Sequence, residues 1–270
     1  MFSLLFLNFT SDAPALLAAT PMPVLVGLFS FIYGACIGSF ANAASLRLLQ
    51  DEDPISQPSR CRFCDRKLRI FENIPIIGYL LLWGRCGCKK QSLPFRYLFI
   101  ELGVGCLFLA YAACLPLWAC LALSCAAAIM SIAFLTDLSG MVLWTSSLLF
   151  GAVAGIIAAV IIPAWPVSVL ASAFGSLVGA GLIFISNIIY KIARGTQGFG
   201  TGDVWLMGMI GAWFGPIGAI TIFFGGAYLG AILGISLILL GQRQLSSKLP
   251  FGVFLSIVFL LYPIIYILFN

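Results

Sequence analysis

The chain alternates between long apolar stretches and short polar ones. A helix needs about 20 mainly apolar residues to cross a membrane core of roughly 30 Å. Eight apolar stretches predict helical spans, at residues 23–45, 95–115, 117–136, 141–163, 166–190, 204–214, 216–240 and 251–269. The stretch 204–214 would be only about 16 Å long, and Gly215-Pro216 follows it, which indicates a half-span or one arm of a bent hairpin. The pattern predicts an all-α polytopic membrane protein of about eight transmembrane helices.

The composition supports this fold class. Of the 270 residues, 62% are hydrophobic and only 9% are charged, against about 25% charged residues in an ordinary soluble domain. So few polar side chains cannot cover the surface of a soluble protein. The same deficit excludes a disordered chain and a nucleic-acid-binding protein, although the formal net charge is +5. The expected surroundings of the chain are therefore a lipid bilayer.

The positions of the basic residues predict how the chain crosses the membrane. An even number of predicted spans separates successive basic windows, so all the windows lie on one face, and basic residues mark the cytoplasmic face. We therefore expect both termini outside and a cytoplasmic segment between the first two spans. The 14 Lys and Arg fall in three windows: ten between Arg47 and Arg96, then Lys191 and Arg194, then Arg243 and Lys248.

This topology divides the chain into four parts. Residues 1–22 begin with an apolar run that no basic residue precedes, so we interpret them as an outer-face segment and not as a cleaved signal. The first transmembrane helix, 23–45, comes next, and a cytoplasmic cysteine-containing segment, 46–94, follows it. Residues 95–270 form the predicted bundle of transmembrane helices.

Four cysteines in the cytoplasmic segment predict a metal site. They form two close pairs, Cys61 with Cys64 and Cys86 with Cys88, and 22 residues separate Cys64 from Cys86. Two such thiol pairs are typical of a closed tetrahedral zinc site, which stabilises a segment too small to build a core. Disulfides are the alternative, but the cytosol keeps thiols reduced. We expect a structural zinc ion, because four protein ligands leave no open position for chemistry.

Three of the nine acidic residues belong to predicted spans: Glu101, Asp137 and Asp203. An ionisable side chain at membrane depth is costly and therefore indicates function. Asp137 ends the third span and Asp203 begins the sixth, so both should reach the cytoplasmic rim. Either aspartate could instead cap a helix, Asp137 as a solvated residue at a loop end. For Glu101 we expect a polar interaction that ties its helix to the neighbouring rim of the membrane.

A pair of carboxyl groups at one rim suggests peptide hydrolysis. The two groups share one proton, so one is a base that deprotonates water and the other an acid that protonates the leaving amine. The chain has no histidine, which excludes Ser/His and Cys/His triads and catalytic zinc bound by histidine. Two alternatives stay open: a proton-coupled transporter that uses the carboxylates to carry protons, and a noncatalytic assembly factor that docks through the zinc segment.

Motifs along almost the whole chain resemble those of one bacterial family. The motifs are Gly38-Ser39-Phe40-Ala41-Asn42 with Arg47-Leu48, the two cysteine pairs, Glu72-Asn73-Ile74-Pro75 with Gly78-Tyr79-Leu80, Arg96-Tyr97 with Glu101-Leu102, Gly200-Thr201-Gly202-Asp203-Val204, and Pro250-Phe251-Gly252. In this order, and within eight predicted spans, they resemble the prepilin peptidases, the type IV leader peptidase family of GxGD aspartic proteases.

The resemblance implies that Asp137 and Asp203 are the catalytic pair. It implies removal of leader peptides from type IV prepilin or pseudopilin precursors, at the cytoplasmic face of a bacterial inner membrane, for pilus assembly or type II secretion. Many members then methylate the new N-terminus with S-adenosylmethionine. The four cysteines correspond to the family's two cysteine pairs.

Three places depart from the family pattern. The stretch after Asp137 ends in Leu143-Trp144, where the family usually has Pro-Asp. Cys86 and Cys88 have one residue between them, whereas zinc knuckles usually have two or more. Trp205 replaces the lysine that the family has after its GxGD motif, which removes a positive charge beside Asp203.

Overall fold

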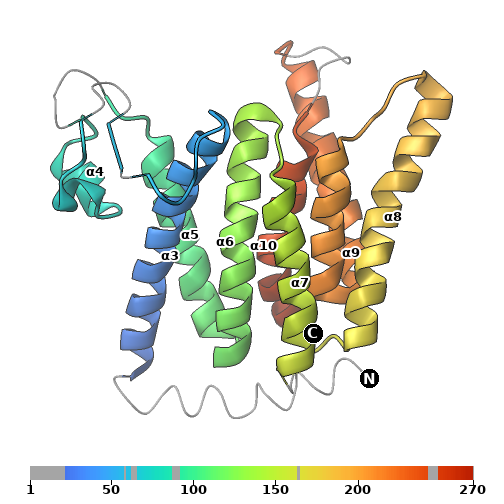
Figure 1. The fold of residues 1–270 in the computed structure, drawn as a ribbon, viewed down its shortest axis with the longest axis horizontal. Coiled ribbons are helices and arrows are strands. Elements are labelled where there is room, and N and C mark those ends of the chain that lie inside the picture. Colours follow the sequence, from blue (N-terminus) through green and yellow to red (C-terminus); the bar gives the residue numbers. More distant parts are fainter. Residues whose placement is uncertain are drawn as a thin grey trace. The chain divides into compact units, whose positions relative to one another are not determined.

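The computed structural model describes residues 22–57, 59–61, 66–86, 92–162, 165–242 and 249–269. These residues form an all-helical fold, and the β pairing found among them consists of two isolated antiparallel bridges, Arg60 with Lys67 and Arg85 with Ser92. The predicted outer-face segment 1–22 lies almost wholly outside the described residues. The elements are α3 (Met22–Leu48), η1 (Ile70–Asn73), α4 (Ile77–Leu81), α5 (Arg96–Cys114), α6 (Leu117–Gly140), α7 (Thr145–Ile161), α8 (Val169–Arg194), α9 (Thr201–Leu239) and α10 (Phe251–Phe269) (Figure 1).

Six of these helices, α3, α5, α6, α8, α9 and α10, are long and apolar enough to cross a membrane. Helix α7 is apolar as well but has only 17 residues. The chain is therefore a multi-pass membrane protein. The eight predicted spans do not reappear one for one, because the stretches 204–214 and 216–240 both belong to α9.

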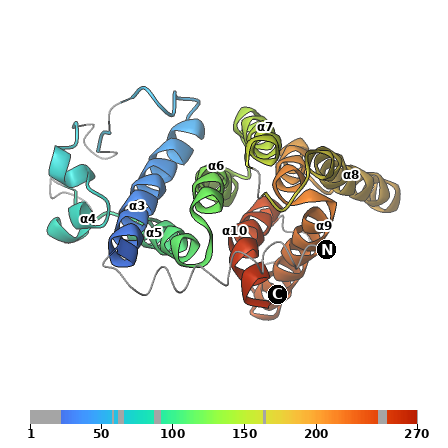
Figure 2. The same cartoon turned by 90° about the horizontal axis from the view of Figure 1, so that it is seen from below.

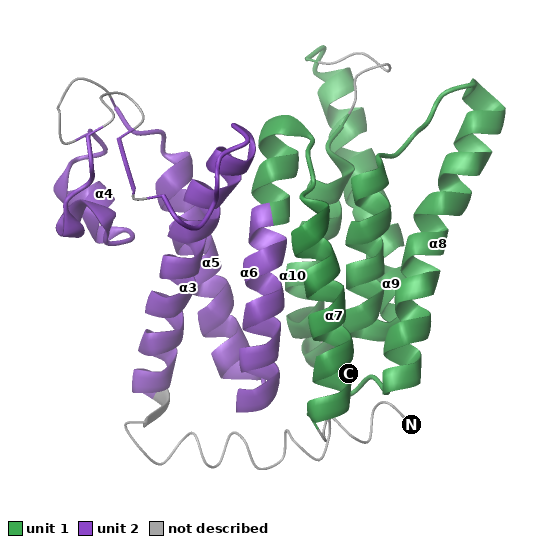
Figure 3. Cartoon of the chain, viewed as in Figure 1, with its two compact units in different colours: residues 1–8, 133–270 green, residues 9–132 purple. Residues whose placement is uncertain are grey.

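The chain folds into two compact units, which we call the N-terminal and C-terminal units (Figure 3). The described part of the N-terminal unit, up to Ile132, holds α3, η1, α4, α5 and most of α6. The C-terminal unit, from Ala133 onward, holds the end of α6 and helices α7 to α10. Both of the predicted catalytic aspartates therefore belong to the C-terminal unit.

In the N-terminal unit, glycines let α3 pack closely against α5. A Cβ atom added at Gly34 would lie 2.7 Å from the carbonyl oxygen of Val104, and one at Gly38 would lie 3.0 Å from that of Ile100. Helices in membranes gain little from apolar transfer and associate through such close van der Waals packing. The Gly38-Ser39 motif therefore places α3 beside the start of α5.

In the C-terminal unit, α9 lies between α8 and α10, and α7 also contacts it (Figure 2). The contact with α8 is so close that a Cβ atom at Gly179 would overlap the carbonyl oxygen of Met207. A buried hydroxyl group reinforces this contact, because Ser172 Oγ donates a hydrogen bond of 2.5 Å to the carbonyl oxygen of Ala212. The start of α9 is thus held firmly against α8.

Helix α9 reverses direction at Gly215. This glycine has φ 70° and ψ −174°, a conformation outside the helical region, and Pro216 follows it. Before the break, Phe214 packs on Phe259 with ring centroids 5.0 Å apart. After it, a Cβ atom at Gly234 would lie 3.0 Å from Leu249, just before α10 begins. The first arm therefore runs parallel to α10 and the second runs back, which agrees with the predicted bent hairpin.

Candidate active site

Asp203 lies in the first turn of α9 and is only partly exposed. The helix begins after Gly200, whose N–H donates a hydrogen bond of 2.9 Å to Asp203 Oδ2. Asp203 is therefore the third residue of the helix and bonds back to the N-cap residue; it is not the N-cap itself. A carboxylate in this position is favoured by the positive end of the helix dipole. The bond fixes one carboxylate oxygen to the backbone.

Asp137 lies in the last turn of α6 and is only 5% exposed. This burial contradicts the alternative of a solvated loop residue. Its Oδ2 accepts a 2.8 Å hydrogen bond from the N–H of Val253, and the N–H of Gly252 also donates to the carboxyl group. These are among the first N–H groups of α10, which have no partner inside their own helix. They offset the unfavourable position of a carboxylate at the C-terminal end of α6.

The two aspartates lie at the same end of the C-terminal unit. Gly252 lies close to both of their helices, because a Cβ atom there would lie 2.8 Å from Asp137 Oδ2 and 3.3 Å from Leu206 Cδ2, in the turn of α9 that follows Asp203. Each carboxyl group is held by backbone N–H groups through its Oδ2 atom. A pair held in this way can share one proton and act as acid and base together.

A polar and aromatic connection joins the two backbone segments that bind these carboxyl groups. Asn187 of α8 holds both backbone groups of Phe199: its Nδ2 donates to the carbonyl oxygen at 3.1 Å, and its Oδ1 accepts from the N–H at 2.8 Å. The Phe199 ring meets that of Phe251 edge to face, with centroids 4.9 Å apart. Phe199 comes just before Gly200, and Phe251 just before Gly252, so this connection fixes both aspartate-binding segments.

Two family models match this chain. The model described as the bacterial peptidase A24 N-terminal domain matches residues 32–115, and that of the type IV leader peptidase family matches residues 124–235. A protein of Pseudomonas putida named prepilin leader peptidase/N-methyltransferase is 30% identical over 211 residues, which cover 74% of this chain and 69% of that protein. The chain belongs to the type IV leader peptidase family.

Further relatives carry the same printed name. The protein of Aeromonas hydrophila is 27% identical and the alignment covers 87% of this chain and 89% of that protein. The protein of Stutzerimonas stutzeri is 28% identical, with 89% and 90% covered. No solved structure matches this chain significantly. The resemblance seen in the motifs is therefore confirmed at the level of the family, and this member is an enzyme of the peptidase class.

Two of the departures of this peptidase from the family pattern can be located in the structure. Leu143, near the end of the unusual stretch after Asp137, packs against the start of α9, since a Cβ atom at Gly202 would lie 2.7 Å from Leu143 Cβ. An apolar contact thus joins the two aspartate-bearing segments there. The indole of Trp205, two residues after Asp203, is 45% exposed, so Trp205 belongs to the surface of the helix.

The third membrane carboxylate of this peptidase, Glu101, belongs to the N-terminal unit. It is 7% exposed, accepts a 2.7 Å hydrogen bond from the N–H of Ile76 and also bonds to the Ser39 side chain. Glu101 therefore ties α5 to α3 and to the segment before α4. The predicted polar tie is confirmed.

The first cysteine of each predicted pair lies next to an isolated antiparallel bridge. Cys61 and Cys86 are both buried, and each follows a residue that forms an isolated bridge, Arg60 with Lys67 and Arg85 with Ser92. Cys64 and Cys88 lie outside the described residues. Within the described ranges, no group of three or more His, Cys, Asp or Glu is gathered as at a metal site. The structural zinc ion therefore stays a prediction.

Asn187 is the site residue that the sequence analysis missed. A signal was present, because Asn187 is an amide within the apolar run Ile183–Tyr190. A polar side chain in such a run needs a hydrogen-bond partner at membrane depth. Its partner could not be named without the fold, because the loop that it binds returns to α8 only after the helix has ended.

Proposed function

We propose that this chain is an aspartic endopeptidase that removes the leader peptide of type IV prepilin-like precursors. The observation that carries the proposal is the placement of Asp137 and Asp203 at one end of the C-terminal unit, each held by backbone N–H groups. The names of the relatives, prepilin leader peptidase/N-methyltransferase, supply the substrate class. They favour peptide cleavage over the transport and docking alternatives.

In the proposed reaction, the ionised aspartate takes a proton from a water molecule, which then attacks the scissile carbonyl. The protonated aspartate donates a hydrogen bond to the carbonyl oxygen and then supplies the proton that the leaving amine needs. The backbone donors on each Oδ2 hold the carboxyl groups in place, so little reorganisation is needed during the reaction. Asp137 and Asp203 carry the chemistry, and Asn187 keeps the Asp203 loop in position.

The precursor would reach this pair from within the membrane. Its apolar N-terminal helix would pack among the spans, and the leader boundary would lie at the rim that carries the aspartates. The three basic windows support a cytoplasmic position for this rim, with both termini outside, in the bacterial inner membrane. The precursor and the lipid bilayer are the proposed partners.

A purified preparation would test the reaction directly. In detergent, it should shorten a model precursor by its leader. In proteoliposomes, it should show no solute-dependent proton uptake, because the aspartates gather at one rim and do not span the membrane depth. Proton-coupled uptake together with an intact precursor would instead support the transporter alternative.

The second proposed activity is methylation of the newly formed N-terminus, with S-adenosylmethionine as the methyl donor. The printed names of the relatives support it. The cleaved product should gain the mass of one methyl group only when S-adenosylmethionine is present. Cleavage itself should proceed without it, because the acid–base pair needs no cofactor.

The third proposed element is a structural zinc ion held by Cys61, Cys64, Cys86 and Cys88. Zinc bound by four thiolates would stabilise a segment that has little apolar core, and would take no part in the cleavage step. We expect about one equivalent of zinc per chain by elemental analysis. Cys61→Ser should lose most of it, whereas Cys106→Ser, in the exposed surface of α5, should keep it. A metal-free preparation that remains folded and active would contradict this role.

Replacing Asn187 should slow cleavage without weakening precursor binding. Asn187→Ala removes both hydrogen bonds to Phe199, and a misplaced catalytic group can lower a rate by about 10²-fold. We expect kcat to fall while KM changes little. Asn187→Asp can still accept from the N–H of Phe199 and should be less impaired. Equal losses in both variants, or an effect on KM alone, would exclude a positioning role.

A further inference from the structure

The segment between α3 and α5 carries a group of exposed apolar side chains. On α4, Ile77, Leu80 and Leu81 are spaced three and four residues apart and so lie on one side of the helix. The other side faces the protein, because a Cβ atom at Gly78 would lie 2.6 Å from the carbonyl oxygen of Glu72. We call the group the docking face; it consists of Ile70 (89% exposed), Ile77 (52%), Leu80 (58%), Leu81 (61%) and Trp83 (89%).

Trp83 is the most unusual residue of the docking face. Its φ of 53° lies in the left-handed region, which bulky side chains rarely adopt. Its N–H closes the turn after α4 by bonding to the carbonyl oxygen of Leu80 at 3.0 Å. The turn thus presents an indole that is 89% exposed. Backbone outliers of this kind cluster at functional sites, and the packing of the described residues gives no reason for a tryptophan here.

The docking face is fixed next to the place where α5 enters the membrane. Tyr79 of α4 donates a 3.2 Å hydrogen bond to the carbonyl oxygen of Leu93, and its ring lies 6.1 Å from that of Phe95. Phe95 and Phe99, at the start of α5, are 69% and 70% exposed, and α5 is a candidate span. Figure 1 shows α4 beside the ends of α3 and α5 at which this segment begins and ends. The docking face is therefore held next to the exposed apolar start of a candidate span.

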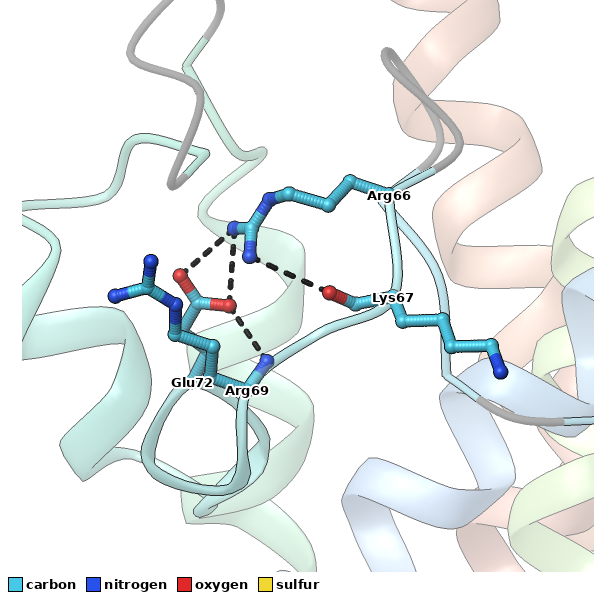
Figure 4. Close-up of polar contacts among 4 residues, drawn as sticks. All are labelled: Arg66, Lys67, Arg69 and Glu72. Atoms are coloured by element: carbon cyan, nitrogen blue, oxygen red, sulfur yellow. Dashed lines mark hydrogen bonds and ion pairs between the residues drawn. The ribbon is translucent and has the colours of Figure 1, made fainter.

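The charges around the docking face are mainly positive. Among the described residues between 54 and 94, five are Lys or Arg and one, Glu72, is acidic. Glu72 is engaged inside the segment: it pairs with Arg66 at 2.8 Å and accepts from the N–H of Arg69 at 2.7 Å (Figure 4). The Arg66 guanidinium lowers the pKa of the Glu72 carboxyl group, so Glu72 stays ionised and paired. Lys67 and Arg69 are exposed beside Ile70.

We propose that the docking face inserts into the headgroup layer of the membrane that the chain crosses, with anionic lipids as its partner. Tryptophan is enriched at membrane interfaces, and basic residues near a membrane are attracted to anionic headgroups. The segment is tethered to that membrane at both ends, by α3 and by α5. Its positive charge also disfavours a basic peptide as the occupant. This inference goes beyond the proposed peptidase function, since neither aspartate is part of the docking face.

The depth of Trp83 in a lipid bilayer tests the proposal. The full chain, labelled with 5-fluorotryptophan, is placed in nanodiscs of phosphatidylcholine and phosphatidylglycerol. Its six tryptophans give ¹⁹F resonances, and the one missing from Trp83→Phe belongs to Trp83. We expect a nitroxide lipid labelled near the headgroup to broaden this resonance strongly, and a water-soluble gadolinium chelate to broaden it little. Trp118, 68% exposed in the candidate span α6 and assigned through Trp118→Phe, serves as the lipid-facing reference.

The opposite pattern would overturn the proposal. If the aqueous chelate broadens the Trp83 resonance and the nitroxide lipid does not, the docking face lies in water. A protein would then be its partner, and not a lipid. In nanodiscs of phosphatidylcholine alone, or in the Lys67→Glu/Arg69→Glu variant, we expect a several-fold smaller nitroxide effect. An undiminished effect in both would overturn the role of anionic lipids. The measurement does not use the precursor, so its outcome is independent of the peptidase assay.

Discussion

Replacing either Asp137 or Asp203 with asparagine should lower the rate of precursor cleavage by about 10³-fold or more. Asparagine has nearly the same shape and can still accept the backbone hydrogen bonds of Gly200 or of Val253. It can neither share a proton nor take one from water, so the acid–base pair is lost. Because the two groups act as one unit, the double variant should be no slower than the single variants.

The rates should be measured on purified protein in detergent, with a model precursor, alongside the thermal unfolding of each variant. Asp53→Asn is the matched control, because Asp53 is an exposed residue that caps a turn through the N–H of Ile55. It should leave cleavage unchanged. Full activity in Asp137→Asn or Asp203→Asn would remove that residue from the pair, and additive losses in the double variant would argue against a shared proton.

The second large effect is expected from one added methyl group between α8 and α9. In Gly179→Ala the new Cβ would overlap the carbonyl oxygen of Met207, a backbone atom that cannot rotate away. The helices must then separate, and overpacking of this kind costs about 1–3 kcal/mol. Met207 lies one turn after Asp203, so the same shift should also displace the candidate active site.

Gly181→Ala is the matched control, on the same helix two residues further on. Nothing lies within 4 Å of a Cβ atom added there. Alanine should be neutral or stabilise the helix by up to about 1 kcal/mol. The midpoints of thermal unfolding in detergent and the cleavage rates should therefore separate the two variants. Equal midpoints would mean that α8 and α9 are not packed as closely as the structure has them.

The apolar pattern predicted the bounds of three helices well. Helices α3, α5 and α10 lie within three residues of their predicted bounds. The prediction was less good around Asp137, where α6 continues to Gly140 and α7 begins only at Thr145. Hydropathy places the end of a span where polarity begins. It does not show that Asp137 is buried inside the last helical turn, since that burial depends on donors from α10.

The sequence predicted the two carboxyl groups of the candidate site, but it did not predict the groups that hold them in place. An aspartate at the end of an apolar stretch is visible in a sequence because its burial is costly. The bond from Val253 to Asp137 joins residues 116 positions apart, and no local pattern reveals such a contact. The same holds for Asn187, whose role depends on where the loop before Asp203 returns.

Local sequence patterns did not predict the docking face either. Ile70, Leu80 and Trp83 belong to a largely apolar run within the cytoplasmic segment, and apolar residues in such a run would ordinarily form a small core. Their exposure follows from the turn at Trp83 and from the inward position of Gly78 and Tyr79. Both depend on the packing of α4 against η1 and on the start of α5.

The most direct test of the account is mass spectrometry of a model precursor after incubation with the purified chain and S-adenosylmethionine, compared with the Asp203→Asn variant. The account predicts one cut, after the glycine at the leader boundary, with a methyl group on the new N-terminus. The variant should leave the precursor intact. An intact precursor with the natural chain, or the same cut with the variant, would contradict an aspartic peptidase built on Asp137 and Asp203.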